Sequence, residues 1–508
     1  MNVKKGVKNI AYAMIGQIIA LGLGIIVPRI VIVSYGSEVN GLLTSVSQII
    51  TYLTLLEAGV GSAALQALYK PISEMNTDSI NSILSATHSY YRRTGVIYFL
   101  LSVALSFAYP IIVNTTLDYW FVVAIVLICG IPNVINYFFQ GKLKILLSAT
   151  GDNYIVTNLA TITSTLATVS KILLLLAGSN VIFVQLVYCA VSLVQMLFIY
   201  LFVRKKYPWV NVRVKPDLEA LKQKNSTLLH QICVLITNST DVLLLSIFCD
   251  LKVASIYAVY NMVFSIVYNM SNSINGGVQF ILGNAFCKGR EYYKRVIDFY
   301  ESYYMGICSA LMTITYIMIL PFLKLYIAGA DIDYIDFWVP ILFTAIELLR
   351  AMRNSSVNTI SVAGHFKQTS NYAVIESTIN LSVSLALIMW LGIYGVLIGT
   401  VVAFTYRNIV SIHYSNKQIL GRSSAHSIKI AFTNIALIVL LGFAAGFVKI
   451  EITGYGMWVL YAIIVSICSF AMFLVVNSVV SPKSFGELVS YLKRKLLRKR
   501  ENNIEKHD

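Results

Sequence analysis

Long apolar runs alternate with short polar segments along the whole chain. Each run approaches the length of about 20 residues that an α-helix needs to cross a bilayer. The pattern therefore predicts an all-α polytopic membrane protein. It has about fourteen transmembrane helices, expected at residues 9–34, 39–68, 90–113, 119–139, 154–177, 181–203, 225–248, 254–283, 299–326, 336–353, 370–391, 395–415, 428–448 and 454–480.

The longest polar segment divides these helices into six before it and eight after it. A weak internal similarity between residues 34–50 and 247–263 supports the division, because each stretch follows the first helix of its half. We expect two six-helix bundles around a central cavity, with two further C-terminal helices. The expected parts are an N-terminal lobe, a basic linker, a C-terminal lobe, helices 13 and 14, and a basic tail, at residues 1–203, 204–224, 225–427, 428–480 and 481–508.

Lysine and arginine gather in the loops on one side of the expected membrane. The same side carries Lys4, Lys5 and Lys8 and the basic run at residues 493–500. Basic loops mark the cytoplasmic side, so both termini are expected in the cytoplasm. The outer loops are short, as at residues 114–118, and any chemistry is therefore expected within the bilayer or at its face.

The amino-acid composition also indicates a polytopic membrane protein. Of the 508 residues, 57% are hydrophobic and only 12% are charged, and the net charge is +16. No basic patch is interleaved with aromatic residues on a soluble module, so a nucleic-acid partner is not expected. The seven cysteines lie singly in or beside apolar runs, and neither a metal site nor another cofactor is expected.

Polar side chains line single faces of several expected helices. In the fifth helix, hydroxyl groups at spacings of three and four residues lead to Lys171, which places them on one side of an α-helix. Packing explains hydroxyl groups as well, because Ser and Thr hydrogen-bond neighbouring membrane helices. The competing interpretation is a wet cavity with a polar lining of Thr54, Thr161, Ser164, Thr168, His230, Thr237 and Asn380.

Ionisable side chains inside the spans favour the cavity. A charge at the centre of a bilayer costs at least about 2.5 kcal/mol, so it normally faces water or a partner. We expect the cations to hold an anionic substrate, and the carboxylates to balance them or to bind a coupling Na⁺ or H⁺. The candidate cations are Arg29, Lys171, Arg350 and Arg407, and the candidate anions are Glu57, Asp241, Glu347 and Glu376.

Other interpretations of these charges stay open at this point. Lys171 could snorkel towards the outer face, and Glu347 could pair with Arg350, three residues further on. Glu376 and Arg407 lie nearer the cytoplasmic face, where snorkelling is easier. The last two helices lack buried charge, which fits either a peripheral position or a groove for a lipid tail.

Three stretches resemble a known family. The run PRIVIVSYGSEVNGLLTSVSQIITYLTLLEAGVGSAA at residues 28–64 resembles the first two helices of Wzx-type polysaccharide flippases. STDVLLLSIF at residues 239–248 is similar to their seventh helix, and GIYGVLIGTVVAF at residues 392–404 to the start of their twelfth. These flippases belong to the multidrug/oligosaccharidyl-lipid/polysaccharide (MOP) exporter superfamily.

The resemblance implies a V-shaped transporter, not an enzyme, that works by alternating access in the bacterial cytoplasmic membrane. Its substrate would be an undecaprenyl-pyrophosphate-linked oligosaccharide, moved to the outer leaflet for surface polysaccharide such as O-antigen or capsule. Implied partners are membrane lipids, a polysaccharide polymerase and other assembly proteins. By position, Arg29 and Lys171 fit the cation role, and Glu57 and Asp241 fit a coupling or structural role.

Two alternatives differ in substrate or chemistry. A multidrug antiporter of the same superfamily would favour an acidic cavity. The four candidate cations equal the four candidate anions in number, so this count does not distinguish the antiporter from the flippase. A membrane-embedded polysaccharide polymerase needs a large outer loop with catalytic residues, and the outer loops are too short. Asp331 and Asp333 form a DxD-like string in the longest of them, which is expected to be a solvated turn.

Overall fold

A computed structural model describes residues 22–57, 60–219, 224–447 and 452–486. Within these residues the secondary structure is helical, without strands. Eleven described helices are long and apolar enough to cross a membrane, which identifies a multi-pass membrane protein. Each of the fourteen expected spans has a helical counterpart among the described residues, so the predicted fold class is confirmed.

The helices form two compact units. Unit 1 contains the chain as far as Val259, together with Gly329–Asp333 and Leu385–Val396, and unit 2 contains the remainder. The division runs through three long helices, α10 (Leu251–Cys287), α13 (Phe366–Leu391) and α14 (Ile393–Tyr414). The predicted domain boundary at residues 204–224 stays a prediction.

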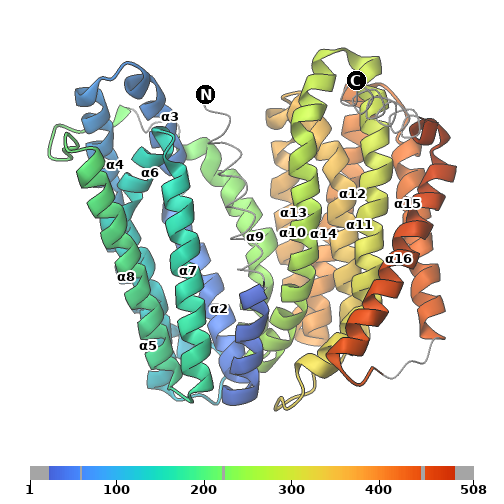
Figure 1. Cartoon of the computed structure of the whole chain (residues 1–508), viewed down its shortest axis with the longest axis horizontal. Coiled ribbons are helices and arrows are strands. Elements are labelled where there is room, and N and C mark those ends of the chain that lie inside the picture. The colour runs from blue at the N-terminus through green and yellow to red at the C-terminus, as the bar shows by residue number, and fades with distance from the viewer. Residues whose placement is uncertain (1–21, 58–59, 220–223, 448–451, 487–508) are drawn as a thin grey trace, which may run out of the picture. The chain divides into compact units, whose positions relative to one another are not determined.

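Unit 1 is a bundle in which α4, α5, α7 and α8 run side by side (Figure 1). A buried apolar cluster includes Leu42 of α2, Val122 of α5 and Val184 of α8. Gly41 allows the closest approach in this bundle, because a Cβ atom there would overlap the backbone of Leu251. The helices of unit 1 are Gly22–Tyr35, α2 (Ser37–Leu53), α3 (Val60–Ser73), α4 (Thr77–Ile112), α5 (Tyr119–Ile135), α6 (Gly141–Ala149), α7 (Asn153–Leu176), α8 (Val181–Lys206) and α9 (Lys224–Phe248).

Unit 2 is organised around α11 (Arg290–Tyr326), which packs against α12 (Trp338–Val362), α15 (Ala425–Gly446) and α16 (Tyr455–Val480). Tyr293, Cys308 and Phe473 lie in its core. At 37 residues, α11 extends roughly 55 Å, well beyond a hydrocarbon layer of about 30 Å. Its first turns therefore project from the apolar layer, which explains why the apolar pattern predicted only residues 299–326.

The prediction of one continuous second helix, residues 39–68, is wrong. The α-helix α2 ends at Leu53 and passes into a 3-10 turn, η1 (Thr54–Glu57), and α3 begins at Val60. The fourth span is also interrupted, by a π-helical turn, η2 (Asn136–Gln140), between α5 and α6. Such turns inside a helix mark hinges and functional sites more often than regular helix does.

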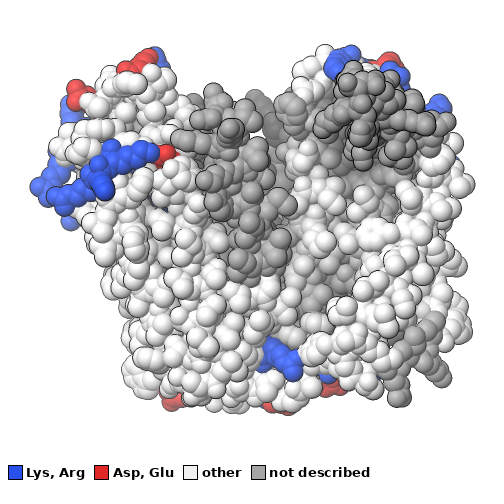
Figure 2. Space-filling view, viewed as in Figure 1, with Lys and Arg blue, Asp and Glu red and all other residues white. Residues whose placement is uncertain are grey.

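On the face shown in Figure 2, the charged side chains of the described residues lie near the top and bottom of the view, and uncharged described side chains occupy the broad band between them. This band has the character of a lipid-facing surface. At one end of unit 1, the last turn of α8 and the loop after it expose Arg204, Lys205, Lys206, Arg213 and Lys215.

One residue of the DxD-like string, Asp331, has a structural role. The backbone N–H of Ser37 donates to Asp331 Oδ1 at 2.9 Å, so this carboxylate satisfies the start of α2. Burial raises the pKa of Asp331, but the hydrogen bonds from Ser37 outweigh it and the pKa falls below its usual value.

Candidate functional site

The eight charged candidates divide between the two units. Arg29, Lys171, Glu57 and Asp241 belong to unit 1, and Glu347, Arg350, Glu376 and Arg407 to unit 2. The candidates of each unit are therefore described separately. His230 is the one polar candidate whose side chain lies outside the described residues.

Unit 2 brings its four candidates to three neighbouring helices. Glu347 and Arg350, both on α12, form an ion pair at 3.0 Å, which confirms the alternative that they pair with each other. Glu376 on α13 forms ion pairs with Arg353 of α12 and, at 3.7 Å, with Arg407 of α14. We call these five residues the arginine cluster.

Sequence reasoning missed Arg353. The predicted tenth span ends at Arg353, whereas α12 continues to Val362. Arg353 lies three residues after Arg350, and this spacing on one helical face was the available signal. Both carboxylates of the arginine cluster are buried, with side-chain exposures of 6% for Glu347 and 8% for Glu376.

The arginine cluster carries an excess of positive charge, because three guanidinium groups face two carboxylates. Nη1 of Arg407 is buried and has no hydrogen-bond partner among the described residues. Aromatic rings cover the remaining faces: Arg350 lies 4.5 Å from the Tyr268 ring centroid, and Arg353 lies 4.7 Å from that of Phe404. Such an arrangement suits a planar or tetrahedral anion, because arginine binds carboxylate and phosphate groups with two parallel hydrogen bonds.

Unit 1 has no comparable cluster of cations within its described part. Lys171 is half-buried on α7, near the Cys129 thiol of α5, and no described carboxylate pairs with it. The hydroxyl groups before it bond to their own helix, since Ser164 donates to the Thr161 carbonyl and Thr168 to the Ser164 carbonyl. The role of Lys171 as an anion contact stays a prediction, as does that of the half-buried Arg29.

The carboxylates of unit 1 are held by tyrosines. Asp241 on α9 is 5% exposed and accepts a hydrogen bond from Tyr257 at 2.7 Å. Glu57, in the 3-10 turn after α2, accepts one from Tyr91 of α4. The other polar candidates make backbone or interhelical bonds: Thr54 and Thr237 donate to carbonyls of their own helices, and Asn380 donates to Thr400 at 2.9 Å.

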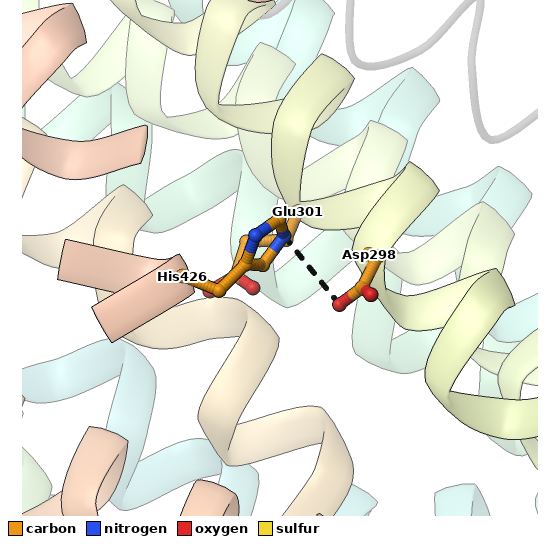
Figure 3. Close-up of side chains that lie close together, drawn as sticks. All are labelled: Asp298, Glu301 and His426. Carbon is orange, nitrogen blue, oxygen red and sulfur yellow. Dashed lines mark ion pairs between the residues drawn. The ribbon is translucent and has the colours of Figure 1, made fainter. Parts of the chain in front are cut away.

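One further group of side chains has the composition of a metal site. Ligand atoms of Asp298 and Glu301 on α11 and of His426 in the first turn of α15 all lie within 4.8 Å of one another (Figure 3). Arg422 already forms ion pairs with both carboxylates, and His426 Nε2 lies 3.5 Å from Asp298. This group is therefore a charged link between the two helices, built from the protein's own cation.

A groove of about 670 Å³ lies in unit 2 between α11, α12 and α15. Its walls are almost entirely apolar and include Tyr316, Leu348, Gly442, Phe443 and Phe447. Gly442 leaves room for the Tyr316 ring, since a Cβ atom there would lie 2.9 Å from it. The groove has the size and lining that suit a hydrocarbon chain.

The described residues form an all-helical, multi-pass membrane protein, and solved structures share its architecture. The lipid II flippase MurJ, in an inward closed conformation, aligns with a TM-score of 0.69 over 92% of this chain and 98% of that chain, at 13% identity. An inward-facing multidrug resistance MATE family transporter of the MOP superfamily aligns with a TM-score of 0.62 over 80% of this chain and 98% of that chain, at 15% identity.

A third similar structure is the MATE multidrug transporter DinF-BH in complex with R6G. Its TM-score is 0.53 and its identity 13%, over 81% of this chain and 95% of that chain. These neighbours are flippases and transporters rather than enzymes, and at this level of identity they establish the fold. No family model and no curated protein matches the sequence.

Proposed function

We propose that the protein is a MOP-superfamily flippase that moves an undecaprenyl-pyrophosphate-linked oligosaccharide from the inner to the outer leaflet of the bacterial cytoplasmic membrane. Transport proceeds by alternating access and serves the synthesis of a surface polysaccharide of the O-antigen or capsule kind. The translocated unit then passes to a polysaccharide polymerase and its assembly partners.

The observation that carries this proposal is the arginine cluster. Its three guanidinium groups exceed its two carboxylates by one charge, and Arg407 Nη1 has no described partner. A pyrophosphate supplies the missing negative charge and the acceptor oxygens. An organic cation, the substrate class of the competing multidrug antiporter, would be repelled at the same place.

The apolar groove of unit 2 supports the same substrate class. A lipid-linked oligosaccharide carries a long hydrocarbon tail beside its anionic group, and unit 2 offers a surface for each kind of chemistry. The fold shared with the lipid II flippase MurJ adds support, because that protein is named for a lipid-linked substrate.

The test is deletion of the gene in its native bacterium, followed by analysis of lipid-linked intermediates on each side of the membrane. We expect complete single repeat units to accumulate in the inner leaflet and surface polysaccharide to be lost. Translocated but unpolymerised units would instead indicate a polymerase. Unchanged glycan with increased sensitivity to cationic dyes would indicate a multidrug antiporter.

Complementation then assigns the residues. We expect the double substitution Arg353→Ala with Arg407→Ala to fail to restore polysaccharide, although the protein reaches the membrane. Lys417→Ala is the matched control, because this lysine is exposed in the π-helical turn η4 (Ser415–Leu420) directly after α14. Full complementation by the double variant would contradict the assignment of the arginine cluster to the substrate.

A further inference from the structure

The polar segment that follows α8 lies against α4 as a non-helical strap, which we define as residues 207–219. Hydrogen bonds hold it to the first turns of α4. Asn81 donates to the Trp209 carbonyl at 3.2 Å, and its Oδ1 atom accepts from the Asn211 N–H at 2.9 Å. A solvated loop needs no such anchors. The strap therefore presents its side chains from a fixed backbone.

Apolar and basic side chains alternate along the middle of the strap. Val210, Val212 and Val214 are half-buried, and the first two pack against a buried apolar cluster of unit 1. Arg213 and Lys215, between and after them, are exposed. Successive side chains of an extended segment point to opposite faces, so the valines fix the strap and the cations face outward.

A third hydrogen bond sets how close these cations lie to the membrane. Ser85 of α4 donates to the carbonyl of Val214, the residue between Arg213 and Lys215, at 2.7 Å. The expected span of this helix begins at residue 90, so Val214 lies beside a turn roughly 8 Å from the apolar layer. The headgroup region on each side of a bilayer is about 5 to 8 Å thick. The two cations therefore lie at the level of the headgroups.

The helix beneath the strap adds two arginines on the same side. Arg92 and Arg93 of α4 are exposed and follow Ser85 by seven and eight residues, which places all three on one helical face. None of the described carboxylates forms an ion pair with these arginines or with Arg213 and Lys215. The four side chains border one strip of surface and leave its positive charge uncompensated by the described protein.

The surroundings of this strip preserve its charge. Arg204, in the last turn of α8, donates to the hydroxyl of Tyr200, and tyrosine is enriched at the membrane interface. The exposed acids of the strap, Asp217 and Glu219, lie at its far end, where the Asp217 N–H donates to the Ser82 carbonyl. Ser82 precedes Ser85 on α4, so these acids are further from the apolar layer. Figure 2 shows lysine and arginine side chains gathered at this end of unit 1.

We propose that this strip binds an anionic phospholipid of the surrounding leaflet, with its phosphate between the strap and α4. Arg213 and Lys215 contact the headgroup from the strap, and Arg92 and Arg93 contact it from α4, because guanidinium groups bind phosphate with parallel hydrogen bonds. The acyl chains lie along the exposed apolar side chains that follow on α4, such as Leu100. This inference goes beyond the proposed function, since it concerns a bound lipid that is not transported.

Native mass spectrometry of the full-length protein in detergent measures this binding without transport. Phosphatidylglycerol is titrated into the micelles, and the apparent dissociation constant of the first bound lipid is compared between variants. We expect Arg213→Gln with Lys215→Gln to weaken binding about thirtyfold, which corresponds to roughly 2 kcal/mol for two basic side chains. Arg92→Gln with Arg93→Gln should weaken it to a similar degree, and this pair tests the site independently if the strap variant fails to fold.

Two further variants separate the site from net charge. Lys288→Gln with Arg295→Gln is the matched control, because it removes the same charge from exposed positions in unit 2 and should leave the affinity unchanged. Ser85→Ala keeps every cation but removes the hydrogen bond to Val214. We expect it to weaken binding about fivefold, because the strap then holds its cations less firmly.

Four results would overturn the proposal. The first is unchanged affinity in both the strap and the α4 double variants. The second is an equal loss in the control pair, which would make the effect one of net charge alone. The third is equal affinity for phosphatidylcholine, whose headgroup carries no net charge. The fourth is displacement of the lipid by an equal concentration of glycerol 3-phosphate, which would make a soluble phosphate the ligand.

Discussion

The two units hold the candidate charges of their spans in different ways. Unit 2 gathers three arginines around two glutamates on regular α-helices, with aromatic rings over the guanidinium groups. In unit 1, tyrosine hydroxyls donate to Glu57 and to Asp241, and Glu57 lies at an interrupted helix. A buried carboxylate that is paired with arginine is stabilised in its ionised form. A buried carboxylate without a paired cation is stabilised by protonation. This difference is why we propose that unit 2 binds the anionic group of the substrate.

The largest expected effect on stability lies in the arginine cluster. Arg353→Ala removes the ion pair to Glu376 and leaves this buried carboxylate with Arg407, at 3.7 Å, as its remaining partner. We expect a loss of about 3 kcal/mol in the free energy of unfolding, the lower end of the range for breaking a buried pair, because Arg407 still compensates the carboxylate. Thermal unfolding in detergent measures it. Arg295→Ala, which changes an exposed arginine on α11, is the control and should lie within about 0.5 kcal/mol of wild type.

A smaller effect is expected where Tyr91 packs over a glycine. Gly141→Ala introduces a methyl group that overlaps the Tyr91 ring, so we expect a loss of about 2 kcal/mol. Gly283→Ala on α10 meets no atom within 4 Å and should be neutral or slightly stabilising. Equal unfolding temperatures for the two variants would contradict the tight packing around Glu57.

Tyr91→Phe removes only a hydroxyl group and should cost about 1.5 kcal/mol, because the lost hydrogen bond reaches a carboxylate. The loss should shrink when Glu57→Gln is introduced first, and a double-mutant cycle on unfolding temperatures measures the coupling. Strict additivity of the two changes would show that the hydroxyl and the carboxyl do not interact.

The apolar pattern predicted the helices well because crossing a bilayer requires local hydrophobicity, which is written directly in the sequence. The interruption at Glu57 was missed because the same hydropathy continues through it, although the Glu-Ala-Gly string at residues 57–59 was a signal. Which charges meet could not be predicted, since Glu376 reaches Arg353 and Arg407 only when three helices pack together. The pair Glu347–Arg350 was predictable because both residues share one helix.

The smallest expected effect on stability concerns Asp331, whose carboxylate accepts a hydrogen bond from the start of α2. Its pKa is lowered in the folded protein, so its carboxylate stabilises the fold above the unfolded pKa, and this contribution is lost as pH falls through the folded pKa. Asp331→Asn should therefore flatten the dependence of the unfolding temperature on pH below about pH 4. The effect should stay below about 1 kcal/mol, as for an exposed helix cap. If the unfolding temperature of Asp331→Asn depends on pH in the same way as that of the wild type, Asp331 does not have this role.

Translocation in proteoliposomes is the most direct test of the proposed function. Lipid-pyrophosphate-linked oligosaccharide is placed in one leaflet, and a membrane-impermeant glycosidase reports its arrival in the other. We expect the wild-type protein to move it, Arg407→Gln to slow it about tenfold or more, and Lys417→Ala to leave the rate unchanged. A wild-type rate equal to that of protein-free vesicles, or a full rate in Arg407→Gln, would contradict the assignment of unit 2 as the site that holds the pyrophosphate.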